Sequence, residues 1–327
     1  MRKLFLVLLV LAVADVAQAD PGKLLVSSYD PTRELYAQDF NPAFIKFWKE
    51  KTGKDAAIEM SHGPSGSQAR KIVEGVEADI AALSVSVDVD LLRKNKLLKE
   101  DWQTRLPNNS SPYTSTVVFL VRKGNPKRIK DWADLTQPGL EILCPNPKTG
   151  GGARWVYLAA WGQVVTNGGD ETAAREYVKK FYKNAQLDPA MRGSTGRFVK
   201  NQGDVLVGWE NEILQVLDTP GGKSKYEIVV PTSSITIEVP IAWVDSNIDK
   251  HGNRDLAEAY VKFMFSDEGQ EIVAKRFNRP INPEILKKHA DQYPAVKQFT
   301  LKDVFGDWDA VMKKHFENDG VFDQILK

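Results

Sequence analysis

The sequence predicts an α/β protein with two lobes and mostly parallel sheets, and three observations lead to this fold class. Short apolar runs repeatedly lead into amphipathic stretches through small, polar or glycine-rich turns, a pattern typical of alternating strands and helices. Residues 20–327 form a chain that is longer than a single hydrophobic core usually supports, so we expect two lobes. Two extended segments, 113–124 and 234–244, are long enough to pass from one lobe to the other.

The first part of the chain alternates strand and helix patterns. "KLLVSSYD" predicts a first strand, after which Asp30-Pro31 begins a helix with Asp30 as the N-cap and Pro31 in the first turn. "AAIEM" predicts a second strand, and the Ser65 to Gln68 stretch that follows has the spacing of a capping box. "ADIAAL" and "VDLLRKNKLL" predict the third strand and its helix.

The two extended segments predict that the second lobe is an insertion in the first. We expect residues 20–113 and 240–327 to form lobe I and residues 114–239 to form lobe II, with a ligand cleft between them and two crossing strands as a hinge. The insertion repeats the strand, turn and helix order, with strands at "LEILCPNP", "AQLDP" and "DVLVGW". From "RDLAEAYVKF" onward the chain is predicted to be helical and amphipathic.

The N-terminus predicts export. Arg2 and Lys3 precede an apolar run over residues 4–13, and Ala17-Gln18-Ala19 follows, which indicates a signal peptide over residues 1–19 with cleavage before Asp20. The run is about half of the roughly 20 residues that a bilayer span needs. No cysteine follows the cleavage site, so we expect a freely diffusing periplasmic protein and not a lipoprotein.

Charge and cysteine content exclude several functional classes. Once residues 1–19 are removed, basic and acidic residues are equal in number, which argues against a nucleic-acid or membrane-surface partner. Cys144 is the only cysteine, so the chain has no internal disulfide and no cysteine-rich metal site, and we expect a buried thiol. The histidines show no metal-ligand spacing, and we expect no metal and no cofactor.

A run of three glycines, Gly150 to Gly152, stands at the start of a predicted helix. Helix N-termini present N–H groups without intrahelical partners at the positive end of the macrodipole, and glycine lets a ligand approach the backbone closely. Several such ends in one cleft make an anion site without positive side chains. A tight turn with close strand–helix packing is the structural alternative for a glycine run.

Nucleotide binding and hydrolysis are the rival readings. A P-loop requires Gly-Lys-Ser/Thr after the turn, whereas Lys148 precedes the glycines, and the dinucleotide fingerprint is absent. The stretch from Gly63 to Ser67 resembles a Gly-x-Ser-x-Gly nucleophile elbow, but Ser67 replaces its last glycine and His62 is too close in sequence for the usual triad. A secreted hydrolase is therefore the alternative from a different class.

Several motifs resemble one protein family along nearly the whole mature chain. "SYDPTRELY", "SHGPSGSQA", "PYTSTVVFLVRKGNPK", "NPKTGGGARWVYLAAWG", "RGST", "GDVLVGWENE" and "VFGDWDAVMKKHF" are similar to the periplasmic sulfate-binding proteins of ATP-driven sulfate and thiosulfate importers. The resemblance implies a type II two-lobe periplasmic binding fold, no enzymatic activity, and a monomer that delivers its anion to an inner-membrane ABC permease.

The family resemblance also implies a ligand set. A dehydrated sulfate would be held by neutral donors in the cleft, namely the backbone N–H groups of Asp30, Ser65, Gly151, Gly152 and Met191 and the indole N–H of Trp209. Thr149, Arg154 and His62 would lie near the site without contacting the anion directly. Helix capping by Asp30 and Ser65, and a core position for Trp209, are the purely structural readings of these residues.

One position departs from the family pattern. The family places a serine hydroxyl where this chain has Gly150, also a predicted site residue, and one of about seven donors is thereby lost at a cost of roughly 0.5–3 kcal/mol. Thr149 or a water molecule could compensate for it. Sulfate is the predicted ligand, thiosulfate is the second reading because its softer sulfur could use the space, and molybdate or tungstate is the third.

Overall fold

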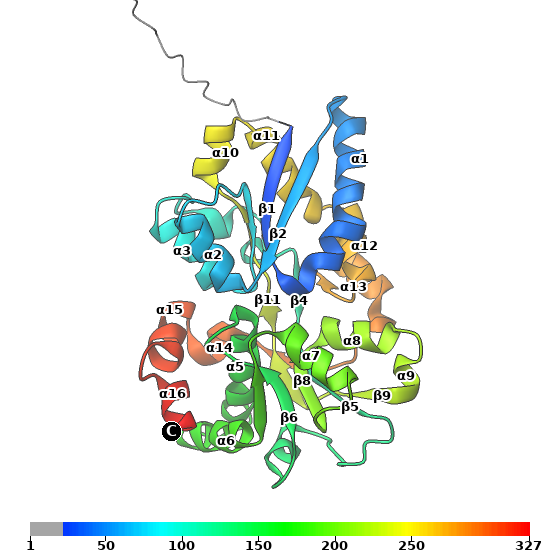
Figure 1. Cartoon of the computed structure of the whole chain (residues 1–327), viewed down its shortest axis with the longest axis vertical. Coiled ribbons are helices and arrows are strands. Elements are labelled where there is room, and N and C mark those ends of the chain that lie inside the picture. Colours follow the sequence, from blue (N-terminus) through cyan, green and yellow to red (C-terminus); the bar gives the residue numbers. More distant parts are fainter. Residues whose placement is uncertain (1–21) are drawn as a thin grey trace, which may run out of the picture.

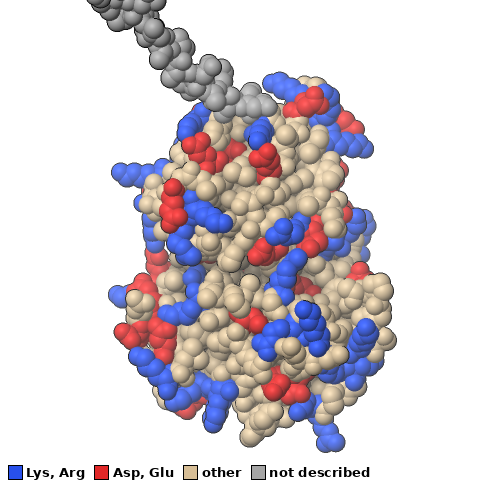
Figure 2. All heavy atoms as spheres, in the orientation of Figure 1, with Lys and Arg blue, Asp and Glu red and all other residues tan. Residues whose placement is uncertain are grey.

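The computed structural model describes residues 22–327 and shows two lobes, with β4 (Tyr113–Ser115) and β11 (Ile237–Glu238) between them (Figure 1). The predicted signal peptide, residues 1–19, lies outside the described residues. Among residues 22–327, no helix is long and apolar enough to cross a membrane. Positive and negative side chains are interspersed over the face in Figure 2, in keeping with the nearly balanced composition.

The first lobe is built on a four-stranded sheet in the order β12-β3-β1-β2. β1, β2 and β3 are parallel and β12 is antiparallel to β3. Leu24 and Val26 of β1 pack into one core cluster, whereas Leu25 packs against the other, so helices cover both faces of the sheet. The elements are β1 (Lys23–Tyr29), η1 (Asp30–Thr32), η2 (Leu35–Phe40), α1 (Asn41–Thr52), β2 (Ala57–Gly63), α2 (Ser65–Val73), β3 (Ile80–Ala82), α3 (Ser86–Lys94), η3 (Trp102–Thr104), α4 (Pro107–Ser110), β12 (Ile241–Trp243), α10 (Asp245–His251), α11 (Arg254–Met264), α12 (Asp267–Lys275), α13 (Pro283–Lys288) and η5 (Ala290–Gln292).

The second lobe has a five-stranded sheet in the order β7-β6-β8-β5-β9. β6 is parallel to β7 and β8, and β5 is antiparallel to both of its neighbours. Cys144 on β6 is fully buried in this lobe, which confirms the expected buried thiol. The elements are β5 (Val117–Arg122), η4 (Trp132–Thr136), β6 (Ile142–Pro145), α5 (Gly151–Thr166), α6 (Glu171–Lys183), β7 (Ala185–Asp188), α7 (Met191–Val199), β8 (Val205–Trp209), α8 (Glu210–Asp218), α9 (Gly222–Lys225) and β9 (Tyr226–Val229).

The chain passes between the lobes three times instead of the two times expected. The first crossing joins β4 to β5, and the second runs through β10 (Ser233–Ile235) and β11. The third follows β13 (Arg279–Pro280) and leads through β14 (Lys297–Phe299), which pairs in parallel with β10. β4 pairs with β11 and β13, so a small three-stranded sheet ties the crossings together.

After the third crossing, the C-terminal residues pack on the second lobe, which differs from the expectation that residues 240–327 all belong to the first (Figure 1). The ring of Phe322 contacts that of Tyr157 on α5, and the Lys148 ammonium pairs with Asp323 at 2.8 Å. The apolar side chains of this segment find their burial against α5 and α6. Its elements are α14 (Leu301–Phe305), α15 (Trp308–Val311), η6 (Met312–Phe316) and α16 (Val321–Leu326).

Two predicted helix caps are wrong. η1 begins at Asp30 with Tyr29 as its N-cap residue, and the Asp30 carboxylate pairs with Arg33 at 3.2 Å instead of capping. α2 begins at Ser65 itself, and the Ser65 hydroxyl accepts the backbone N–H of Ser84 at 3.1 Å. The Asp30 carboxylate is engaged by a neighbouring residue and the Ser65 hydroxyl by a distant one, which leaves the first N–H groups of each helical segment without a side-chain acceptor.

Candidate functional site

A small cavity lies between the lobes and contains all seven residues predicted to bind the ligand. Its volume is about 40 Å³. A single water needs roughly 10–15 Å³ of such space, whereas organic ligands usually occupy pockets of about 300–1,000 Å³, so the cavity suits a small inorganic ion. The lining residues are Tyr29, Asp30, Pro31, Gly63, Pro64, Ser65, Ser84, Pro145, Gly150, Gly151, Gly152, Ala153, Ala190, Met191, Trp209 and Glu212.

Helical segments from both lobes begin at this cavity. α2 begins at Ser65 in the first lobe, and α5 and α7 begin at Gly151 and Met191 in the second. The turn η1 begins at Asp30. The first N–H groups of a helix have no intrahelical partner and carry the positive end of the dipole, so the convergence of these N-termini favours an anion.

The glycines at the start of α5 are required by close approach of other groups. A Cβ on Gly151 would lie 2.7 Å from Asp88 Oδ2 and 2.8 Å from Ser84 Oγ, both in the first lobe. A Cβ on Gly152 would lie 3.2 Å from the Trp209 ring. Glycine at these two positions therefore lets the lobes close around the cavity and lets the indole pack against the helix start.

Trp209 lines the cavity at the end of β8 and is almost fully buried. Its ring packs against Tyr29 of the first lobe with centroids 5.7 Å apart. Its indole N–H donates to the carbonyl oxygen of Gly152 at 3.0 Å. The predicted donor is therefore satisfied by a neutral acceptor here, and contact with an anion would require this N–H to exchange or share its partner.

The position that departs from the family can accept a side chain. Gly150 has a φ of −121°, outside the left-handed region, and a Cβ there would meet only ordinary contacts, the nearest being Pro189 O at 3.5 Å. The neighbouring Thr149 hydroxyl donates to Pro189 O at 2.7 Å, with Asn146 O also within 3.2 Å. Because this hydroxyl is already engaged with carbonyl groups, Thr149 does not replace the missing donor.

Arg154 and His62 lie close to the cavity but do not line it. The Arg154 guanidinium pairs with the Asp88 carboxylate of the first lobe at 3.4 Å. His62 Nδ1 and Ser28 Oγ are 2.6 Å apart, and burial, together with the nearby Arg33 charge, lowers the pKa of His62. His62 is therefore neutral at pH 7 and adds no charge to the site.

Nine of the residues that line the cavity were not predicted from the sequence, among them Ser84 and Glu212. Ser84 follows β3, and ligands of open α/β sheets bind outside the carboxyl ends of strands, which is the signal that could have found it. Glu212 lies in the first turn of α8, and burial raises its pKa to about 8, against the opposing influence of the Arg192 charge. The raised pKa of Glu212 favours its neutral acid form at pH 7, which reduces its repulsion of an anion.

Polar contacts hold the lobes together around the cavity. Arg192 Nη2 of α7 lies 2.8 Å from both carboxylate oxygens of Glu34, and the Trp155 indole donates to Ser84 O at 3.0 Å. The lobes are therefore closed in this structure.

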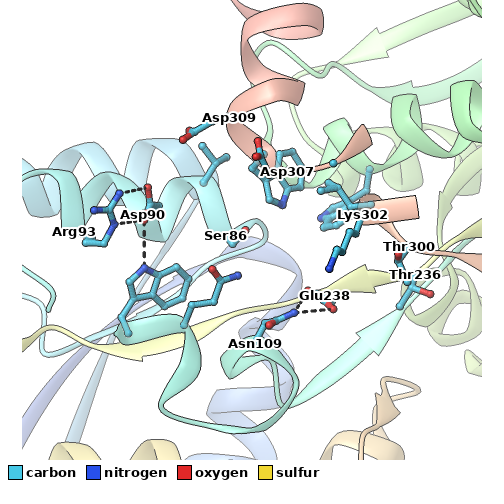
Figure 3. Close-up of a pocket in the computed structure, with 17 residues that line it drawn as sticks. Ser86, Asp90, Arg93, Asn109, Thr236, Glu238, Thr300, Lys302, Asp307 and Asp309 are labelled. Carbon is cyan, nitrogen blue, oxygen red and sulfur yellow. Dashed lines mark hydrogen bonds and ion pairs between the residues drawn. The ribbon is translucent and has the colours of Figure 1, made fainter. Parts of the chain in front are cut away.

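A second and larger cavity, of about 580 Å³, lies between α3 and the C-terminal segment (Figure 3). Its wall carries Asp90, Glu238, Asp307 and Asp309. Arg93 in the same wall already pairs with Asp90 at 2.5 Å. The carboxylates outnumber the basic groups, so this cavity disfavours a dianion although it is the larger one.

Among residues 22–327, no cluster of three or more His, Cys, Asp or Glu side chains could hold a metal ion.

The two lobes and the small cavity enclosed between them define a solute-binding protein of the periplasmic binding fold. The chain belongs to the bacterial extracellular solute-binding proteins, whose family model matches residues 36–277. It is 48% identical over 320 residues to the sulfate-binding protein of Escherichia coli, covering 97% of both chains. It is 49% identical over 305 residues to the thiosulfate-binding protein of Pseudomonas aeruginosa, covering 92% of this chain and 91% of the relative. The solved structure of the sulfate-binding protein SubI from Mycobacterium tuberculosis matches with a TM-score of 0.79 and 28% identity, covering 90% of this chain and 99% of that one.

Proposed function

We propose that this protein captures sulfate in the periplasm and delivers it to an ABC-type importer in the inner membrane. The observation that carries the proposal is the closed cavity of about 40 Å³ at which helical segments of both lobes begin. The relatives named sulfate-binding and thiosulfate-binding proteins, which this chain matches over nearly its whole length, support the same class of ligand.

The proposed ligands are neutral hydrogen-bond donors. Sulfate would accept from the backbone N–H groups of Asp30, Ser65, Gly151, Gly152 and Met191 and from the Trp209 indole, all of which belong to cavity residues. Donors and dipoles act strongly on a dianion in a closed cavity because little water screens them. A protonated phosphate would need an acceptor for its hydrogen, and this ligand set consists of donors, so phosphate should bind poorly.

Closure of the lobes links capture to delivery. The Arg192–Glu34 pair and the Trp155–Ser84 hydrogen bond form only when the lobes meet, so the closed form presents both lobe surfaces in one fixed arrangement. We infer that a monomer in this form docks on the permease and that no chemical step takes place on the protein.

Thiosulfate is the second candidate, and Gly150 is the observation that favours it. The cavity wall lacks a hydroxyl at this position, and the Thr149 hydroxyl is engaged with Pro189 O. The softer and larger terminal sulfur atom of thiosulfate would lose less binding energy than an oxygen next to this part of the wall, which offers no hydroxyl donor.

Isothermal titration calorimetry of ligand-free protein with sulfate, thiosulfate and phosphate tests the proposal. We expect one site per chain, micromolar or tighter binding of sulfate, and no heat from phosphate at the same concentration. Tighter binding of thiosulfate than of sulfate would make thiosulfate the first candidate ligand and sulfate the second. No binding of either sulfur oxyanion at millimolar concentration would reject the proposal.

A further inference from the structure

Ser84 carries a buried hydroxyl without a hydrogen-bond partner in the wall of the anion cavity. The residue is only 1% exposed, and its Oγ has no partner among residues 22–327. Buried hydroxyl groups are normally paired, and leaving one unpaired destabilises the fold. An unpaired hydroxyl at a ligand cavity is therefore better explained by a ligand than by packing.

The backbone of Ser84 is fixed on both sides. Its N–H donates to Ser65 Oγ at 3.1 Å, and its carbonyl accepts from the Trp155 indole at 3.0 Å. Ser65 begins α2 in the first lobe, whereas Trp155 belongs to α5 in the second. These bonds leave rotation of the hydroxyl as the main freedom of the side chain, so the hydroxyl can turn its hydrogen towards a bound acceptor.

The hydroxyl also lies beside one of the proposed backbone donors. Ser84 Oγ is 2.8 Å from the point where a Cβ on Gly151 would stand. Gly151 is the first residue of α5, and both residues line the cavity. A ligand held by the N–H groups at the start of α5 would therefore lie within reach of the Ser84 hydroxyl.

We propose that Ser84 donates its hydroxyl hydrogen to the bound oxyanion and supplies the side-chain donor that Gly150 cannot. The inference rests on the proposed function, which it deepens by naming a further ligand residue. The family pattern places a hydroxyl donor at position 150, in the second lobe, whereas the hydroxyl of Ser84 belongs to the first lobe. The donor then reaches the anion from the opposite side of the cleft, and it does so when the lobes are closed.

Asp88 offers the competing explanation. Its Oδ2 is also buried without a partner and stands 2.7 Å from the same Cβ position on Gly151. If the Ser84 hydroxyl served Asp88, its removal would lower the stability of the ligand-free protein and leave sulfate affinity unchanged. If the Ser84 hydroxyl binds the anion, its removal lowers sulfate affinity and does not lower the stability of the ligand-free protein, because an unpaired hydroxyl contributes nothing favourable to the ligand-free fold.

The test measures both quantities on Ser84→Ala. We expect the sulfate affinity to fall roughly tenfold, while the melting temperature of the ligand-free protein stays constant or rises. Ser86→Ala is the matched control, since Ser86 lies two residues further along, at the start of α3, but lines the second cavity, and it should keep wild-type affinity. Ser84→Ala combined with Gly150→Ser should regain affinity, because a side chain at position 150 meets only ordinary contacts.

Wild-type affinity in Ser84→Ala, or an equal loss in Ser86→Ala, would overturn the inference and leave the proposed function standing. A lower melting temperature with unchanged affinity would assign the hydroxyl to Asp88 and would also overturn it. Absence of both sulfate and thiosulfate binding in the wild-type protein would overturn the proposed function, and this inference with it.

Discussion

Replacement of Trp209 with Phe tests whether the indole N–H binds the anion. In the closed structure this N–H donates to Gly152 O at 3.0 Å, so binding of sulfate exchanges a neutral acceptor for a charged one. The substitution deletes the donor and keeps most of the apolar ring. The affinity change therefore measures the difference between the two hydrogen bonds and not the whole value of either one.

The expected magnitude follows from that exchange. A hydrogen bond between neutral groups contributes about 0.5–1.5 kcal/mol and one to a charged group about 1.5–3 kcal/mol, so the difference is about 1–1.5 kcal/mol. Because about 1.4 kcal/mol corresponds to a tenfold change, sulfate affinity should fall by roughly five- to twelvefold. The ligand-free protein should also lose about 1 kcal/mol of stability with the Gly152 hydrogen bond, and the smaller ring adds a cavity term.

Trp132→Phe supplies the control. Trp132 is buried in the second lobe, away from the cavity, and its indole donates to Ser233 O at 2.8 Å. Calorimetry and chemical denaturation of both variants should show similar losses of stability, with a loss of sulfate affinity in Trp209→Phe alone. Unchanged affinity in Trp209→Phe would make this residue purely structural and refute the reasoning.

The remaining predictions concern linkage, the departure at Gly150, pH and closure. Sulfate at a hundredfold excess over Kd should stabilise the folded protein by about 2.7 kcal/mol, seen as a higher melting temperature that chloride and phosphate do not produce; an unchanged melting curve would contradict binding. Gly150→Ser alone should tighten sulfate binding or leave it unchanged, and weaker binding in a folded variant would show by calorimetry that the glycine serves another ligand. Burial raises the pKa of Glu212 to about 8, and the neutral form of this side chain tolerates the dianion. Sulfate affinity should therefore be constant from about pH 5 to 7 and fall above pH 8 by at most about tenfold per pH unit. Glu212→Gln should abolish this fall in affinity, and a fall that persists in the variant would show that another group titrates. Glu34→Gln should weaken binding by only about 0.2–1 kcal/mol, because the Arg192–Glu34 pair is partly exposed, and a larger loss would show that closure depends on this one contact.

Much of the site could be predicted from local sequence signals. Glycines before an apolar helix indicate a close approach to its N-terminus, and Gly151 and Gly152 do lie at the start of α5 with other groups against them. The strands at residues 23–29, 142–145 and 205–209 were recognisable because short apolar runs end at turns.

The features of the site that the sequence did not predict depend on contacts between residues that are distant in the sequence. The Ser65 hydroxyl has the spacing of a helix cap, yet it accepts from Ser84 N, a partner 19 positions away. The indole of Trp209 is paired with Gly152 O, 57 positions away, and the carboxyl of Glu212 becomes a neutral acid only through burial. No local pattern encodes such partners, because they exist only after each lobe has formed its tertiary structure.

The C-terminal segment has a consequence for how the protein acquires its structure. α16, at residues 321–326, packs on α6 of the inserted lobe, and β12, at residues 241–243, completes the sheet of the first lobe. Neither core can close from the N-terminal half of the chain alone. Such long-range pairing slows folding, and the last residues of the chain complete the second lobe. For a chain exported from its N-terminus, neither lobe would be complete until almost the entire length of the chain had crossed the membrane. The emerging polypeptide would therefore stay unfolded during translocation. It could capture its ligand only when translocation ends.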